Sequence, residues 1–258
     1  MPFPYLLLMI AIASCNNYPR QLPVTDYNEC SHLNPYATIA DIPLPPGFTR
    51  LPAATGSFAE WLHQLPLKKN KTVYLYNGLP KANQAAQFAV IAISTGNKDL
   101  QQCADAVMRL RAEYLYAQKR FSEIDFADNN HTHYRRQTGA GRAVFNLYLQ
   151  KVFSYCGTAS LDRQLQEVND FTAVKAGDVL IKGGSPGHAM QVIDIAVNKE
   201  GKRIFLLAQS YMPAQDMHVV VNPVNNRFNP WYEANNQALI ETPEWMFTKN
   251  NLKKWPSD

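Results

Sequence analysis

Cys103 and His188 are the two residues whose types and surroundings could do chemistry together. Cys103 lies in the first turn of an expected helix, where free N–H groups and partial positive charge favour a reactive thiolate. His188 follows the glycine-rich stretch 183–187 and begins an expected strand. An imidazole beside such a thiol takes its proton, so the pair could attack an amide carbonyl. The alternatives are a cysteine packed as a small apolar residue and a histidine hydrogen-bonded in a turn.

A third group is needed to orient His188, and Gln209 is the first candidate for it. We expect a hairpin with strands at 188–197 and 203–211 around a turn at 199–202. A two-residue turn at 200–201 leaves Gln209 on the same face as His188 but four positions along, roughly 13 Å away. A bulge or a longer, shifted turn would be needed to join them. Ser210 and Gln215 are alternatives, whereas Asp194 lies six residues along the same strand as His188.

The elements that carry these residues point to an α+β fold in one domain, residues 45–258, because helices come first and a hairpin sheet follows. Ser57 and Glu60 have the spacing of a capping box. Helical spacing of apolar residues predicts helices at 58–65, 100–115, 143–153 and 160–167. Strands are expected at 71–76, 88–93, 178–181, 188–197, 203–211 and 217–221.

The order of the chain, a cysteine at a helix start and then a histidine on an antiparallel hairpin, resembles that of papain-like hydrolases. The stretch from Gly177-Asp178 to Gln191-Val192, which contains His188, also resembles NlpC-type and CHAP cell-wall hydrolases. This resemblance implies a papain-like arrangement of N-terminal helices packed on a hairpin sheet. It makes Cys103 the nucleophile, His188 the base and Gln209 the orienting group, with peptidoglycan peptides as substrate and no cofactor. The alternative is a non-catalytic cell-envelope domain that holds a peptide or glycan beside His188.

Several longer stretches resemble an uncharacterised bacterial domain family whose members are often exported or lipid-anchored. They are LQQCADAVMRLRAEY at 100–114, GGSPGHA at 183–189, AQSYMPAQ at 208–215 and TPEW at 242–245. The resemblance runs from Pro45 to the C-terminus and implies a single domain, with no established activity. The chain is shorter than the family pattern between Asn129 and Arg142.

The N-terminus is typical of an exported protein. Residues 1–15 contain an apolar run too short to span a bilayer, and Ile12-Ala13-Ser14-Cys15 resembles the bacterial lipobox. We therefore expect a signal peptide at 1–15, a lipid on Cys15, a flexible tether at 16–44 and a membrane-anchored lipoprotein facing the periplasm or the cell surface. No Lys or Arg precedes the run. This leaves open an ordinary signal, a misassigned start, or a buried N-terminal strand or helix.

Charge, cysteines and histidines limit the remaining classes. The net charge of +4 is scattered, so we expect no nucleic-acid partner, and we expect a monomer. Cys30, Cys103 and Cys156 remain after Cys15, an odd number that leaves one unpaired in an oxidising compartment, and the spacing does not choose the pair. No metal site is expected, because His131, His133 and His218 have no accompanying acidic motif.

Overall fold

The sheet is the centre of this fold. The computed structural model describes residues 33–136, 141–236 and 238–256, which belong to one compact unit. Its main sheet has nine antiparallel strands, seven of them in the order β2-β9-β8-β7-β6-β13-β5, with β1 added to β7 and β10 to β8. The predicted α+β class is confirmed. The strands of this sheet are β1 (Phe48–Arg50), β2 (Gln87–Val90), β5 (Gln166–Glu167), β6 (Val179–Lys182), β7 (His188–Asn198), β8 (Arg203–Gln209), β9 (His218–Val220), β10 (Tyr232–Ala234) and β13 (Leu252–Lys254).

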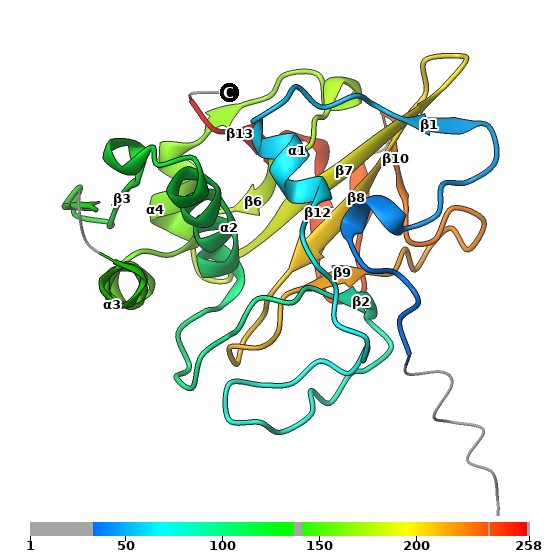
Figure 1. The fold of residues 1–258 in the computed structure, drawn as a ribbon. Coiled ribbons are helices and arrows are strands. Elements are labelled where there is room, and N and C mark those ends of the chain that lie inside the picture. The colour runs from blue at the N-terminus through cyan, green and yellow to red at the C-terminus, as the bar shows by residue number, and fades with distance from the viewer. Residues whose placement is uncertain (1–32, 137–140, 237, 257–258) are drawn as a thin grey trace, which may run out of the picture. The chain divides into compact units, whose positions relative to one another are not determined.

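The two faces of the sheet are covered differently. Helix α2 (Cys103–Ala117) packs on β7 and β8, with α1 (Phe58–His63), α3 (Arg142–Tyr155) and α4 (Thr158–Gln164) around it (Figure 1). The other face packs against a second apolar cluster that includes Phe247 of the hairpin β11 (Leu239–Glu241) and β12 (Met246–Thr248). The short elements are η2 (Ile39–Asp41), η3 (Phe121–Glu123), β3 (Asp125–Ala127), β4 (His133–Arg135), η4 (Phe171–Ala173) and η5 (Lys249–Asn251).

Capping side chains accept hydrogen bonds from backbone N–H groups at the starts of α1 and α2. Ser57 Oγ accepts a hydrogen bond from the Glu60 N–H at 3.2 Å, as the capping spacing indicates. At the start of α2, Asp105 Oδ2 accepts from the Gln102 N–H at 3.0 Å. Because this carboxylate folds back over the first turn, the helix begins at Cys103 itself.

The predictions for two segments are wrong. The segment 71–76 forms no regular strand; it has only single bridges, Tyr74 to Pro80 and Leu75 to Gln215, because side chains such as Gln84 and Asp216 bond its backbone instead. Residues 33–44, predicted to be tether, belong to the folded unit, because Ile39 and Ile42 are completely buried. The Trp231 indole also donates to the Pro43 carbonyl at 2.8 Å.

The predictions for Cys15 and Cys30 lie outside the described residues. Within the described part of the chain, no helix is long and apolar enough to cross a membrane.

The register of the β7–β8 hairpin differs from the expected one and decides what His188 meets. The turn at 199–202 is present, and Val197 pairs with Arg203. A bulge between Val192 and Asp194 then shifts the register by one further residue, so that Gln191 pairs with Ala208. Together the wider turn and the bulge move Gln209 two positions closer to His188 than a plain two-residue turn would.

Candidate functional site

A cleft of about 470 Å³ lies at the N-terminal end of α2. Four segments form its walls: the first turn of α2, the residues between α3 and α4, the loop before β7, and the chain after β8 with Trp245. The lining residues are Asp99, Leu100, Gln102, Cys103, Ala104, Asp105, Phe153, Cys156, Gly157, Thr158, Gly184, Ser185, Pro186, Gly187, His188, Tyr211, Met212 and Trp245. Cys103 and His188, which the sequence analysis proposed as a pair, therefore line one cavity.

Cys103 is the first residue of α2, and its side chain is 8% exposed. Hydrogen bonds from the backbone N–H groups of Ala189, Ala104 and Cys103 itself lower the pKa of its thiol. Burial acts in the opposite direction more strongly and raises this pKa to about 11. The helix start does provide the expected donors, but burial by the surrounding protein atoms outweighs them and favours the neutral thiol over the expected thiolate.

His188 is held at the start of β7, where it pairs with Lys182 of β6. The turn before it requires glycine, because a Cβ on Gly187 would lie 2.6 Å from the Thr158 hydroxyl and 2.8 Å from the Lys182 carbonyl. The imidazole is 1% exposed and is enclosed by three aromatic rings, Tyr211, Trp245 and Phe247. This burial lowers the pKa of His188 to about 4, so the ring is neutral at pH 7.

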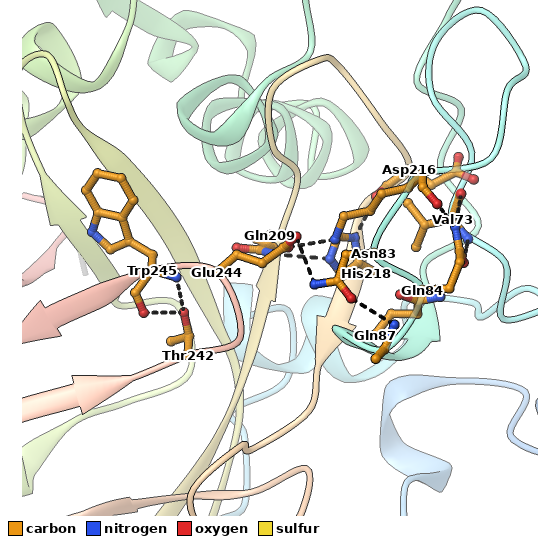
Figure 2. A network of polar contacts seen from close by, with 12 residues as sticks. Val73, Asn83, Gln84, Gln87, Gln209, Asp216, His218, Thr242, Glu244 and Trp245 are labelled. Carbon is orange, nitrogen blue, oxygen red and sulfur yellow. Dashed lines mark hydrogen bonds and ion pairs between the residues drawn. The ribbon is translucent and has the colours of Figure 1, made fainter.

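Gln209 reaches His188, in contrast to the separation of about 13 Å that a plain turn predicts. Its Oε1 accepts a hydrogen bond from His188 Nε2 at 2.8 Å. On the other side of the amide, Gln209 Nε2 lies 2.8 Å from Glu244 Oε2 and 3.3 Å from His218 Nε2. Figure 2 shows Gln209 joined by dashed lines to these partners.

The alternatives to Gln209 were Ser210 and Gln215. Gln215 is 1% exposed, and within the described chain its Nε2 has no hydrogen-bond partner. The Ser210 hydroxyl lies 2.9 Å from the carbonyl oxygen of Gln101 and 2.8 Å from that of Gln215, within donating distance of both. Asp194 is completely buried beside α1, where Arg50 Nε donates to its Oδ2 at 2.7 Å.

Several residues of the cleft were not predicted from the sequence. Asp105 is 6% exposed, and within the described chain its Oδ1 has no hydrogen-bond partner. Burial raises the pKa of Asp105 well above its usual value, and a charge on this carboxyl would raise the pKa of both cleft thiols, Cys103 and Cys156. Cys103 and Cys156 are both free. Glu244 was missed as well; the family-like TPEW stretch was its only signal.

Two histidines outside the cleft, His133 and His218, have separate partners. His133 Nδ1 pairs with Asp125 at 2.9 Å, and His218 is buried beside Gln209 with its Nδ1 on the Asp216 carbonyl at 2.9 Å. Among the described residues, no group of three or more His, Cys, Asp or Glu side chains could hold a metal ion.

Comparison with known proteins supports one assignment. A family model described as "Domain of unknown function (4846)" matches residues 39–137 and 127–254, which include every residue of the cleft. No curated protein and no solved structure matches the chain. The match extends over most of the sequence, and the chain therefore belongs to the family of domain of unknown function 4846.

Proposed function

We propose that this chain is a cysteine hydrolase that cleaves an amide bond, with Cys103 as nucleophile, His188 as base and Gln209 as orienting group. One observation carries the proposal: the Cys103 sulfur accepts a hydrogen bond from the backbone N–H of Ala189, the residue directly after His188. Cys103 and His188 line the same cleft. The His188–Gln209 hydrogen bond supplies the third member of such a site. The antiparallel sheet beneath α2 is compatible with a papain-like arrangement.

The proposed reaction begins from a neutral thiol and a neutral imidazole. The Cys103 sulfur attacks the amide carbonyl carbon while His188 Nδ1 takes the thiol proton. Backbone N–H groups of the first turn of α2 stabilise the oxyanion that forms. His188 then gives its proton to the leaving amine, and a thioester remains on Cys103. Water attacks this thioester with His188 as base, which releases a carboxylic acid and restores the thiol.

The substrate we propose is a peptide of the cell envelope, such as the stem peptide of peptidoglycan. The resemblance of residues 177–192 to NlpC-type and CHAP hydrolases supports this choice, as does the lipobox-like sequence that ends at Cys15. In this proposal the lipid on Cys15 anchors the protein to a membrane on its exported side, within reach of that substrate.

A non-catalytic envelope-binding domain is the second candidate, and the burial of Cys103 and His188 favours it. Burial raises the pKa of the thiol to about 11 and lowers that of the imidazole to about 4, so both are neutral at pH 7, and a neutral thiol is a weak nucleophile. The same cleft would then hold a peptide or glycan without cleaving it.

The test is hydrolysis of soluble peptidoglycan fragments by the full-length chain, followed by mass spectrometry of the products. We expect release of a new amine and a new carboxylic acid, and an acyl group on Cys103 after acid quenching. Cys103→Ala should abolish both signals, and His188→Ala should slow release by about 10²-fold or more. Cys156→Ala is the matched control, a cysteine of the same cleft, and should retain activity. Equal release by Cys103→Ala, or binding of the fragments without any release, would contradict the proposal.

A further inference from the structure

The Gln209 side chain is an amide whose two ends must be told apart, because only its oxygen can accept a hydrogen bond from His188. Its Oε1 lies 2.8 Å from His188 Nε2. Its Nε2 has two neighbours, Glu244 Oε2 at 2.8 Å and His218 Nε2 at 3.3 Å. The chemistry of these two neighbours decides which way the amide faces.

Both neighbours of the amide nitrogen can only accept. A carboxylate such as Glu244 has no proton to donate. His218 Nδ1 lies 2.9 Å from the Asp216 carbonyl, which fixes the proton of His218 on Nδ1 and leaves its Nε2 as an acceptor. Burial lowers the pKa of His218 to about 3, so the ring carries no second proton at pH 7. A reversed amide would place the oxygen of Gln209 against two acceptors.

The carboxylate of Glu244 is held by a buried ion pair. Lys81 Nζ lies 2.6 Å from Glu244 Oε2, and the side chains are 7% and 14% exposed. Hydrogen bonds also fix the backbone of Lys81. Its N–H donates to the Val73 carbonyl, and its carbonyl accepts from Gln84 Nε2. The segment around Gln84 lies beside this network in Figure 2.

We infer that Glu244, held by Lys81, is a positioning residue that fixes the orientation of the Gln209 amide and thereby the tautomer of His188. Because the amide oxygen faces its ring, His188 keeps its proton on Nε2, and its Nδ1 is unprotonated. The importance of an unprotonated Nδ1 for catalysis rests on the proposed function, in which this nitrogen takes the proton of Cys103. The tautomer itself is a property of the resting protein and is measured without any substrate.

The experiment is long-range ¹H–¹⁵N spectroscopy of the full-length chain labelled at its histidine nitrogens, at pH 7. In the unmodified protein we expect His188 with Nε2 protonated and Nδ1 unprotonated, its signals assigned by their loss in His188→Ala. In Glu244→Gln the new side chain can donate as well as accept. The second tautomer of His188 should then appear at about 10% or more, from an undetectable level. Glu241→Gln, an exposed position on the same hairpin, is the matched control and should leave the spectrum unchanged.

A second variant keeps the test decisive if Glu244→Gln fails to fold because Lys81 is left buried without its partner. The double variant Lys81→Met/Glu244→Gln removes both charges and should give the same mixture of tautomers. A single Nε2-protonated tautomer in these variants would overturn the inference, and so would an Nδ1-protonated His188 in the unmodified protein.

Hydrolysis of peptidoglycan fragments separates this inference from the proposed function. If the reaction occurs, Glu244→Gln should lower kcat in proportion to the fraction of His188 in the second tautomer, about twofold when half of the rings take it, with little change in KM, because the change affects the base and not the walls of the cleft. A kcat that does not fall although the second tautomer appears overturns the positioning role in catalysis and leaves the hydrolase in place. A tautomer shift in a protein that hydrolyses nothing supports the positioning role and removes the proposed reaction.

Discussion

At the scale of single residues, the cleft holds a thiol and an imidazole that are both neutral at pH 7. Burial moves the pKa of Cys103 up to about 11 and that of His188 down to about 4, because desolvation disfavours each charged form. A preformed thiolate–imidazolium pair would require the opposite shifts. In the proposed reaction the proton therefore moves during the attack, and His188 must already have the correct tautomer when the substrate binds.

This neutral resting state predicts how Cys103 reacts with iodoacetamide. With a pKa of about 11, only about one thiol in ten thousand is ionised at pH 7. The alkylation rate at Cys103 should therefore rise about tenfold per pH unit between pH 7 and 10, measured by peptide mass spectrometry in a Cys156→Ala background. A rate that is high and independent of pH between 5 and 8 would instead indicate a preformed ion pair.

Sequence alone identified Cys103 and His188 as a pair but not what surrounds them. A cysteine near a helix start and a histidine after glycines are local signals, and both residues line the cleft. Glu244 and Lys81 are separated by 163 residues and belong to no local pattern, so only the folded chain joins them. The depth of burial, which reverses the expected thiol pKa, is likewise a property of the packed structure.

At the scale of elements, strand β7 positions His188 through its bulge and through the turn before it. Asp194 lies at the edge of this bulge, where it accepts a hydrogen bond from the Ile195 N–H at 2.8 Å and pairs with Arg50. Its Oδ1 also lies 2.8 Å from His63 Nε2 of α1. Asp194 therefore ties the shifted part of β7 to β1 and α1. The hairpin and its turn were predictable, but the bulge was not, because nothing in the alternation of apolar residues marks an extra residue.

Replacing Asp194 should be costly, because it leaves Arg50 without its buried partner. We expect Asp194→Asn to lower the free energy of unfolding by about 3 kcal/mol, measured by urea denaturation. Asp125→Asn, which breaks a more exposed pair with Arg135, should cost less than about 1 kcal/mol. Similar losses in the two variants would show that Asp194 does not hold the bulge.

The turn before β7 makes a second prediction at this scale. Gly187→Ala places a Cβ against the Thr158 hydroxyl and the Lys182 carbonyl, where backbone must shift. We expect a loss of about 1–3 kcal/mol in the free energy of unfolding and altered His188 signals in the ¹H–¹⁵N spectrum. Gly157→Ala, in another wall of the same cleft and with nothing within 4 Å of the added Cβ, is the control. A Gly187→Ala protein as stable as this control would refute the steric argument.

At the scale of the whole molecule, the stability of the fold is coupled to pH by buried neutral histidines. Free histidine has a pKa of 6.5, whereas burial holds the folded His218 at about 3 and His188 at about 4. Below pH 6.5 the unfolded chain therefore binds protons that the folded chain cannot. The free energy of unfolding falls as the pH is lowered from 6.5 towards 4, by about 1.4 kcal/mol per pH unit for each histidine.

The contribution of one histidine can be isolated by difference. In His218→Gln the decrease between pH 6.5 and 4 should be smaller than in the unmodified protein by about 1.4 kcal/mol per pH unit, measured by urea denaturation at several pH values. His131→Asn, at an exposed position, should leave the slope unchanged. Equal slopes in all three proteins would mean that His218 is not held neutral by the fold.

The sequence predicted the α+β class and most of the helices, because apolar periodicity and capping residues are local. It failed at the edges of the domain. Residues 33–44 lack periodicity, yet Ile39 and Ile42 fill positions in the core. The strands after residue 221 are only three residues long, too short for an alternating pattern to be recognised.

The Lys81–Glu244 pair has a consequence for how sequences of this family can vary. Glu244 serves both Lys81 and the amide nitrogen of Gln209, so the two positions are not interchangeable. Exchanging the charges would point an ammonium group at an amide that needs an acceptor. We therefore expect relatives to lose the pair together, with an uncharged acceptor at 244, and never to swap it. Substitutions at positions 81 and 244 should therefore be correlated, but the two charges should not be exchanged as they can be in an ordinary ion pair.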